Sequence, residues 1–111
     1  MKYLIVEGML DCTGIYDWAD ESYVEPEEIG LSAELSLRLA NWLKEYEDEH
    51  YRGYVNGTRI QKLDQEGKEI AIAIRQEIAD VKIAYYSDGS MIKWELMISP
   101  DDGSLFWLQV N

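Results

Sequence analysis

The sequence has little cysteine, histidine or proline: one Cys, one His and two Pro in 111 residues. The single cysteine, Cys12, excludes an internal disulfide and fits a reducing compartment, where we expect it to be a small, partly buried apolar residue. The single histidine, His50, excludes His-rich metal sites and leaves one candidate base for Ser-His or Cys-His catalysis. Its position near the end of a predicted helix favours a role at that helix end.

Long apolar runs are also absent. No segment approaches the roughly 20 apolar residues that a membrane-spanning helix needs. The apolar run at residues 3–6 is broken by Glu7 and is too short for the core of a signal peptide. We therefore interpret the first residues as a strand and expect a cytoplasmic protein without membrane contact. The glycines match neither a phosphate-binding loop nor a dinucleotide fingerprint, and no cofactor is expected.

Basic residues are scarce and unevenly placed. Ten Lys and Arg stand against 22 Asp and Glu, which gives a net charge of −12. Residues 1–50 contain thirteen acidic and three basic residues, with no Lys or Arg from Tyr3 to Leu37, whereas residues 51–111 contain nine acidic and seven basic ones. Such a field repels nucleic acid and attracts basic protein surfaces. The alternative is that the charge serves only solubility.

The remaining composition predicts one ordered α+β domain over residues 1–111, with 47% hydrophobic residues. Alternating apolar residues predict strands at 2–9, 81–87, 91–99 and 105–110, with turns at Asp88-Gly89 and at 100–103. We expect an antiparallel sheet of three to four strands with two α-helices packed on one face, in the order β-α-α-β-β-β.

Two helices follow from apolar spacing. The first is capped by Ser32 and should fray near His50. The second is expected to begin at the cap Asp64 and to end near Ala79. The buried stripe of the first helix comprises Leu35, Leu39, Trp42, Leu43 and Tyr46, and that of the second comprises Ile70, Ala71, Ile74 and Ile78.

The segment 10–31 is predicted to be a long acidic loop. Structureless segments of this length inside a compact domain are more often functional than idle. It mixes acids with aromatic residues, which anchor protein interfaces. A second acidic group ends the first helix, where it opposes the helix dipole. The candidate partner-binding residues are Tyr16, Asp17, Trp18, Asp20, Glu21, Tyr23 and Glu25 in the loop and Glu45, Asp48 and Glu49 at the helix end.

Other roles for these residues remain open. Tyr16 and Trp18 could equally belong to the core, and the acidic helix end could be a solvated last turn. Clustered loop carboxylates could act as the acid and base of a hydrolase or bind a hard cation. These carboxylates have no positioned partner residue in the sequence, and the ligand spacing of an EF-hand is absent. We therefore predict neither a catalytic residue nor a metal site. The acids could also imitate DNA phosphates.

Three segments carry a resemblance to a known group. They are the helix with Leu35, Leu39, Trp42 and Tyr46-Glu47, the run Leu63-Asp64-Gln65-Glu66-Gly67-Lys68-Glu69-Ile70-Ala71, and the strand Val81-Lys82-Ile83-Ala84-Tyr85-Tyr86. Over residues 35–86 the chain resembles small bacterial proteins, some of which are immunity proteins encoded beside polymorphic or contact-dependent growth inhibition toxins. The long acidic segment and the three-stranded end depart from that pattern.

The matching residues are structural ones of the stripe, cap and strand, so the resemblance bears on the fold more than on function and brings no catalytic residue. Immunity proteins of this kind are small, acidic and cytoplasmic, and they neutralise a toxin or nuclease domain with a basic surface by tight binding. We therefore expect a binding protein with a basic protein partner and no enzymatic activity. The alternatives are a DNA-mimic inhibitor of a nuclease or restriction system and an acid-dependent hydrolase.

Overall fold

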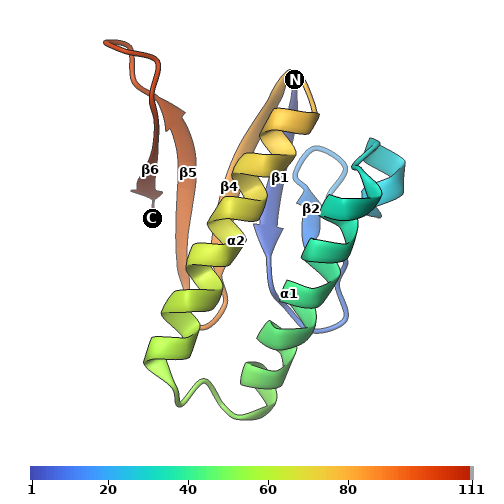
Figure 1. The fold of residues 1–111 in the computed structure, drawn as a ribbon, viewed down its shortest axis with the longest axis vertical. Coiled ribbons are helices and arrows are strands. Elements are labelled where there is room, and N and C mark those ends of the chain that lie inside the picture. Colours follow the sequence, from blue (N-terminus) through green and yellow to red (C-terminus); the bar gives the residue numbers. More distant parts are fainter. Residues whose placement is uncertain (111) are drawn as a thin grey trace.

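Two helices lie on one face of a six-stranded mixed sheet in the computed structural model, which describes residues 1–110 (Figure 1). The strand order across the sheet is β3-β2-β1-β4-β5-β6. The predicted α+β class is confirmed. In chain order the elements are β1 (Lys2–Glu7), β2 (Ile15–Asp17), β3 (Ser22–Tyr23), the 3₁₀ helix η1 (Pro26–Ile29), α1 (Ala33–Tyr51), α2 (Gly57–Glu77), β4 (Val81–Ser87), β5 (Ile92–Ile98) and β6 (Leu105–Val110).

The segment 10–31 is not the predicted loop, because it contains β2, β3 and η1. β2 pairs antiparallel with β1, and β3 pairs antiparallel with β2. The sheet therefore has six strands rather than the predicted three to four. The two additional strands are three and two residues long, which is too short for an alternating pattern to be recognised.

The sheet is mixed because β1 and β4 run parallel, with Lys2 opposite Val81 and Glu7 opposite Tyr86. α1 and α2 form an antiparallel pair, so the chain leaves the helical layer at the end where β1 begins (Figure 1). The next strand must then run in the same direction as β1. The prediction of a purely antiparallel sheet was wrong because it did not consider where the helix pair returns the chain.

The first helix agrees with its prediction. Ser32 caps it by accepting a hydrogen bond from the Leu35 N–H at 3.1 Å. Its predicted stripe forms part of the core: Leu35, Leu39, Trp42 and Tyr46 are buried, and Leu43 packs against them half-buried.

The second helix begins seven residues before the predicted start, at Gly57. Its cap is Asn56, whose side chain accepts a hydrogen bond from the Arg59 N–H at 3.1 Å. Ile60 and Leu63 add two buried positions to the stripe. Asp64, the predicted cap, instead lies inside the helix and is buried, because its carboxylate accepts hydrogen bonds from other elements.

The helices cover only part of the sheet. α2 packs on β1 and β4, whereas β5 and β6 extend beyond it (Figure 1). The three C-terminal strands match their predictions within one residue, and the turn between β4 and β5 spans residues 88–91, two residues more than the predicted Asp88-Gly89. No helix within residues 1–110 has both the length and the apolar character needed to cross a membrane.

Gly67 allows close contact between α2 and the core. A Cβ at this position would lie 2.3 Å from Tyr85 Cε1 and 2.7 Å from Trp42 Cζ2. Gly57, in the same helix, has no atom within 4 Å of such a Cβ. We predict that Gly67→Ala lowers the free energy of unfolding by about 1–3 kcal/mol, because it overpacks the core.

Gly57→Ala is the matched control and should leave stability unchanged or slightly higher, because Ala favours helix. Urea denaturation monitored by circular dichroism measures both. Equal effects of the two substitutions would contradict the packing role of Gly67.

Candidate functional site

One face of the sheet is not covered by either helix. Side chains along β1 alternate between the faces. Leu4 and Val6 point to the helices and belong to the core, so Tyr3, Ile5 and Glu7 lie on the opposite face. This uncovered face is a candidate binding surface, because no helix or other layer of the protein covers its side chains.

Aromatic residues gather on this uncovered face. Strand register places Tyr16 and Tyr86 beside β1, and Tyr23 pairs with Tyr16 from β3. Trp18 follows β2 and stacks on Tyr3 with ring centroids 5.9 Å apart and planes 28° from parallel. We call this set the aromatic face; its members are Tyr3, Tyr16, Trp18, Tyr23 and Tyr86.

Trp18 is exposed yet held in position. Its backbone N–H donates to the Tyr3 carbonyl oxygen at 3.0 Å. The side chain is 57% exposed, which excludes the core alternative. Lys93 Nζ lies 5.2 Å from its ring centroid and 5.1 Å from that of Tyr3, in cation–π range. The indole is therefore a large, pre-positioned contact group.

The other end of the aromatic face is polar. Tyr16 and Tyr23 meet edge to face, with centroids 5.3 Å apart. The Tyr23 hydroxyl donates to Glu7 Oε1 at 2.5 Å. Burial raises the pKa of Glu7 above its ordinary value, although the Tyr23 hydrogen bond opposes this effect. Burial and the Glu7 carboxylate together raise the pKa of Tyr23, so its hydroxyl remains a donor.

Three of the acidic residues that were predicted to contact a partner are exposed near β2 and β3. Asp20 and Glu21 lie in the turn between these strands, directly after Trp18. Glu25 is the N-cap of η1 and forms a capping box with Glu28. The turn carboxylates thus border the aromatic face, whereas Glu25 has a local structural role.

Asp17 and Glu49, which were predicted as partner contacts, are both buried. Asp17 is 2% exposed; its Oδ1 accepts from the Ala19 N–H at 3.0 Å, and Lys2 Nζ lies 3.6 Å from its Oδ2. Glu49 is fully buried, with its Oε1 2.7 Å from Arg59 Nε. Asp17 is compensated by these contacts, whereas Glu49 is compensated at Oε1 only, since its Oε2 has no hydrogen-bond partner among the described residues.

Glu45 and Asp48 are exposed but lie far from the turn. They occupy the C-terminal half of α1, at the opposite end of the molecule from the β2–β3 turn (Figure 1). A 19-residue helix spans roughly 28 Å. The predicted acidic residues are therefore divided between two ends and do not form one surface.

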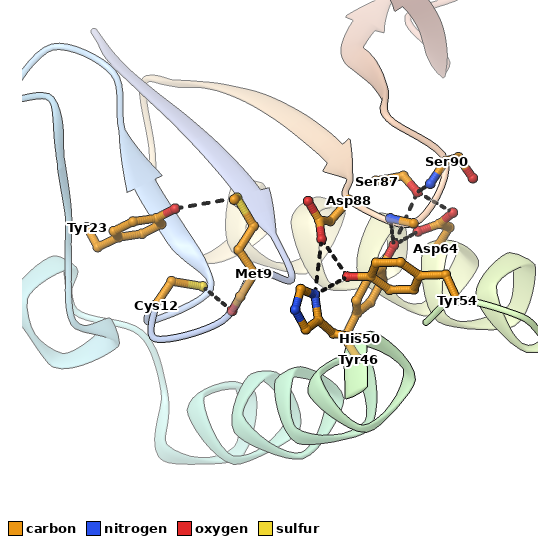
Figure 2. Close-up of polar contacts among 11 residues, drawn as sticks. Met9, Cys12, Tyr23, Tyr46, His50, Tyr54, Asp64, Ser87, Asp88 and Ser90 are labelled. Carbon is orange, nitrogen blue, oxygen red and sulfur yellow. Dashed lines mark hydrogen bonds and ion pairs between the residues drawn. The ribbon is translucent and has the colours of Figure 1, made fainter. Parts of the chain in front are cut away.

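A buried hydrogen-bond network lies under α1 (Figure 2). Asp64 Oδ1 accepts from the hydroxyls of Tyr46 at 2.9 Å and Tyr85 at 2.6 Å, and its Oδ2 accepts from Ser87 Oγ at 2.7 Å. The Tyr46 hydroxyl in turn accepts from the Gly89 N–H at 3.0 Å. Burial is the main cause that raises the pKa of Tyr46 to about 12, and it also raises the pKa of Tyr85. Both hydroxyls therefore remain donors.

His50 lies in the last turn of α1, at the helix end where it was expected, and its contacts border this network. The Tyr54 hydroxyl donates to Asp88 Oδ2 at 2.5 Å, and His50 Nδ1 lies 3.2 Å from the same hydroxyl (Figure 2). These contacts join the α1–α2 connection to the β4–β5 turn.

Cys12 donates to the Met9 carbonyl oxygen at 3.0 Å, and burial raises the pKa of its thiol.

The buried carboxylates do not form a catalytic pair, because Asp17, Glu49 and Asp64 each have different partners. Within residues 1–110 no group of three or more His, Cys, Asp or Glu side chains is arranged to hold a metal ion. The uncovered aromatic face therefore remains the strongest candidate site.

Sequence reasoning found part of this site. It identified Tyr16, Trp18 and Tyr23, which the structure brings together, but it missed Tyr3 and Tyr86. The alternation of the first strand could have revealed Tyr3, since it places Tyr3 on the face opposite Leu4. Comparisons of the chain with protein-family models, curated proteins and solved structures gave no match.

Asp64 is expected to support the structure strongly. Asp64→Asn replaces one acceptor oxygen by a donor, so at least one of three buried hydroxyls loses its acceptor. We predict a loss of about 2 kcal/mol in the free energy of unfolding, the scale of a hydrogen bond to a charged group. Urea denaturation at pH 7 measures it. Asp80→Asn, at an exposed site, should change stability by less than about 0.5 kcal/mol; similar losses in both variants would refute the assignment.

Glu7 provides a pH test. Its raised pKa means that the folded state binds a proton more tightly than the unfolded state, so stability falls as pH rises from the ordinary carboxyl pKa through the raised value. Glu7→Gln removes this loss and keeps an acceptor for Tyr23. The variant should therefore gain stability relative to the wild type between pH 4 and pH 7 in chemical denaturation, whereas exposed Glu21→Gln should not. If the difference in free energy of unfolding between Glu7→Gln and the wild type decreased toward pH 7, this assignment would be contradicted.

Proposed function

We propose that this protein is an acidic cytoplasmic binding protein that neutralises a basic toxin or nuclease domain, as bacterial immunity proteins do. The observation that carries the proposal is the exposed indole of Trp18, stacked on Tyr3 and bordered by the carboxylates of Asp20 and Glu21. Tryptophan and tyrosine at the centre of an interface, with charge at its rim, are the usual composition of binding hot spots.

The Trp18 side chain is already ordered in the free protein. Stacking on Tyr3 and the cation–π contact with Lys93 limit the rotamers of Trp18 before any partner arrives. A side chain that is fixed beforehand loses little conformational entropy on binding. An ordered indole beside other exposed aromatic side chains thus supports recognition of a folded protein surface.

Charge supports a basic partner. The net charge is −12, and most of it lies in residues 1–50, which also contain Trp18. Among residues 1–110, neither Asp20 nor Glu21 takes part in an ion pair, so both remain available to a cationic surface. Opposite charge accelerates encounter more than it tightens the final complex. Nuclease toxins suit this role because they need basic surfaces to bind nucleic acid.

The test is co-expression with the protein encoded by the adjacent gene, followed by calorimetry of the purified pair. We predict that Trp18→Ala weakens binding by about 30-fold or more, equivalent to roughly 2 kcal/mol for a hot-spot residue. Tyr51→Ala is the matched control, because Tyr51 is 73% exposed at the acidic end of α1. Its affinity should be unchanged.

A combined Asp20→Asn and Glu21→Gln variant should slow association and reduce its salt dependence, with little change in dissociation. The absence of a complex and of protection in co-expression would refute the proposed function. A loss of affinity in Tyr51→Ala without one in Trp18→Ala would move the site to the end of α1.

A further inference from the structure

The two edges of the sheet differ in how they are protected from pairing. At one edge, β3 has two residues and is followed by the exposed acid Glu25, with Asp20 and Glu21 before it. Short, charged edges prevent strand addition. At the other edge, β6 is six residues long, with the sequence Leu-Phe-Trp-Leu-Gln-Val, and carries no charge, proline or glycine.

The unprotected edge is also apolar and exposed. Phe106 is 44% exposed and Leu108 is 48% exposed on the uncovered face of the sheet. Leu105 and the neighbouring Ile98 of β5 are 37% and 51% exposed on the other face, beyond the reach of α2. A long, apolar edge strand with free backbone groups is a template for pairing with another strand.

The backbone groups available for pairing can be assigned. The Ser99 N–H donates to the Ser104 carbonyl oxygen at 2.8 Å, which makes this pair a hydrogen-bonded one. Hydrogen-bonded and non-hydrogen-bonded pairs alternate along an antiparallel ladder. The backbone groups of Phe106, Leu108 and Val110 therefore point to β5. Those of Leu105, Trp107 and Gln109 point away from the sheet.

We infer that a second copy of this chain pairs with β6 in antiparallel fashion, about a twofold axis that is perpendicular to the sheet and passes at Trp107. This register uses every outward backbone group: Trp107 pairs with its own symmetry mate, and Leu105 pairs with Gln109 of the other copy. The perpendicular axis keeps the two faces continuous. Phe106 then lies opposite Leu108 of the other copy, an aromatic–aliphatic pair that stabilises a sheet.

Charge favours pairing with a second copy at the β6 edge over pairing at the β3 edge. Two chains of charge −12 repel each other, so they can associate only where charge is low. The acidic β3 edge lies five strand spacings from β6, or about 24 Å, and roughly 53 Å would separate the β3 edges of the two copies. Both distances exceed the Debye length of about 8 Å at physiological salt.

The dimer is independent of the proposed function. It has a continuous twelve-stranded sheet, twice the observed six, with both aromatic faces on one side and all four helices on the other. Each copy keeps its Trp18 free, because Trp18 lies near the far edge of the sheet from β6. The assembly therefore offers two equivalent binding faces on one surface.

Sedimentation equilibrium on the purified chain tests the pairing. We predict a concentration-dependent mass between monomer and dimer up to about 1 mM. Gln109→Pro removes an outward N–H that has no partner in the monomer, so it should weaken self-association about tenfold or more while the melting temperature changes little. Gln109→Ala keeps the N–H and should still dimerise.

A second pair of variants tests the apolar contact. Leu108→Lys should dissociate the dimer, whereas Val55→Lys, at a site 82% exposed in the α1–α2 connection, should not. Hydrogen exchange should slow at the amides of Leu105, Trp107 and Gln109 as concentration rises. A mass that stays monomeric at every concentration would overturn the inference. So would a dimer that remains as stable in Gln109→Pro and in Leu108→Lys as it is in the wild type.

Discussion

The buried carboxylate of Asp64 is the interaction on which the rest of the structure depends. It lies in α2 and accepts hydrogen bonds from Tyr46 of α1 and from Tyr85 and Ser87 of β4. One side chain thus joins both helices to one strand. A buried carboxylate is stable only when its oxygens are satisfied, so the three hydroxyls must keep their positions and the helix pair stays over the centre of the sheet.

The position of the helix pair determines which surfaces remain free. The helices cover one face over β1 and β4, and the opposite face is left to the aromatic residues around Trp18. β5 and β6 extend past α2, which exposes apolar side chains such as Phe106. The proposed binding face and the inferred dimer edge therefore have one cause: two helices are too few to cover six strands.

Charge separates these two surfaces. The exposed acids Asp20 and Glu21 lie in the turn at the β3 edge, close in sequence to Trp18, and β6 has no acidic residue. In our proposals, a basic partner binds at the first surface and a second copy of the chain pairs at the other. The two proposed associations use opposite edges of the sheet and so do not compete for the same strands.

The sequence by itself determined the stripe of α1, the cap Ser32 and the three C-terminal strands, because periodicity and capping are properties of contiguous residues. Only the tertiary structure decided that Asp17 and Asp64 are buried and that Tyr3 supports Trp18. The burial of a carboxylate depends on its partners, and those of Asp64 lie 18 to 23 residues away along the chain. The strands β2 and β3 were beyond prediction for the same reason: they are too short to show a period, and they exist because β1 offers an edge to pair with.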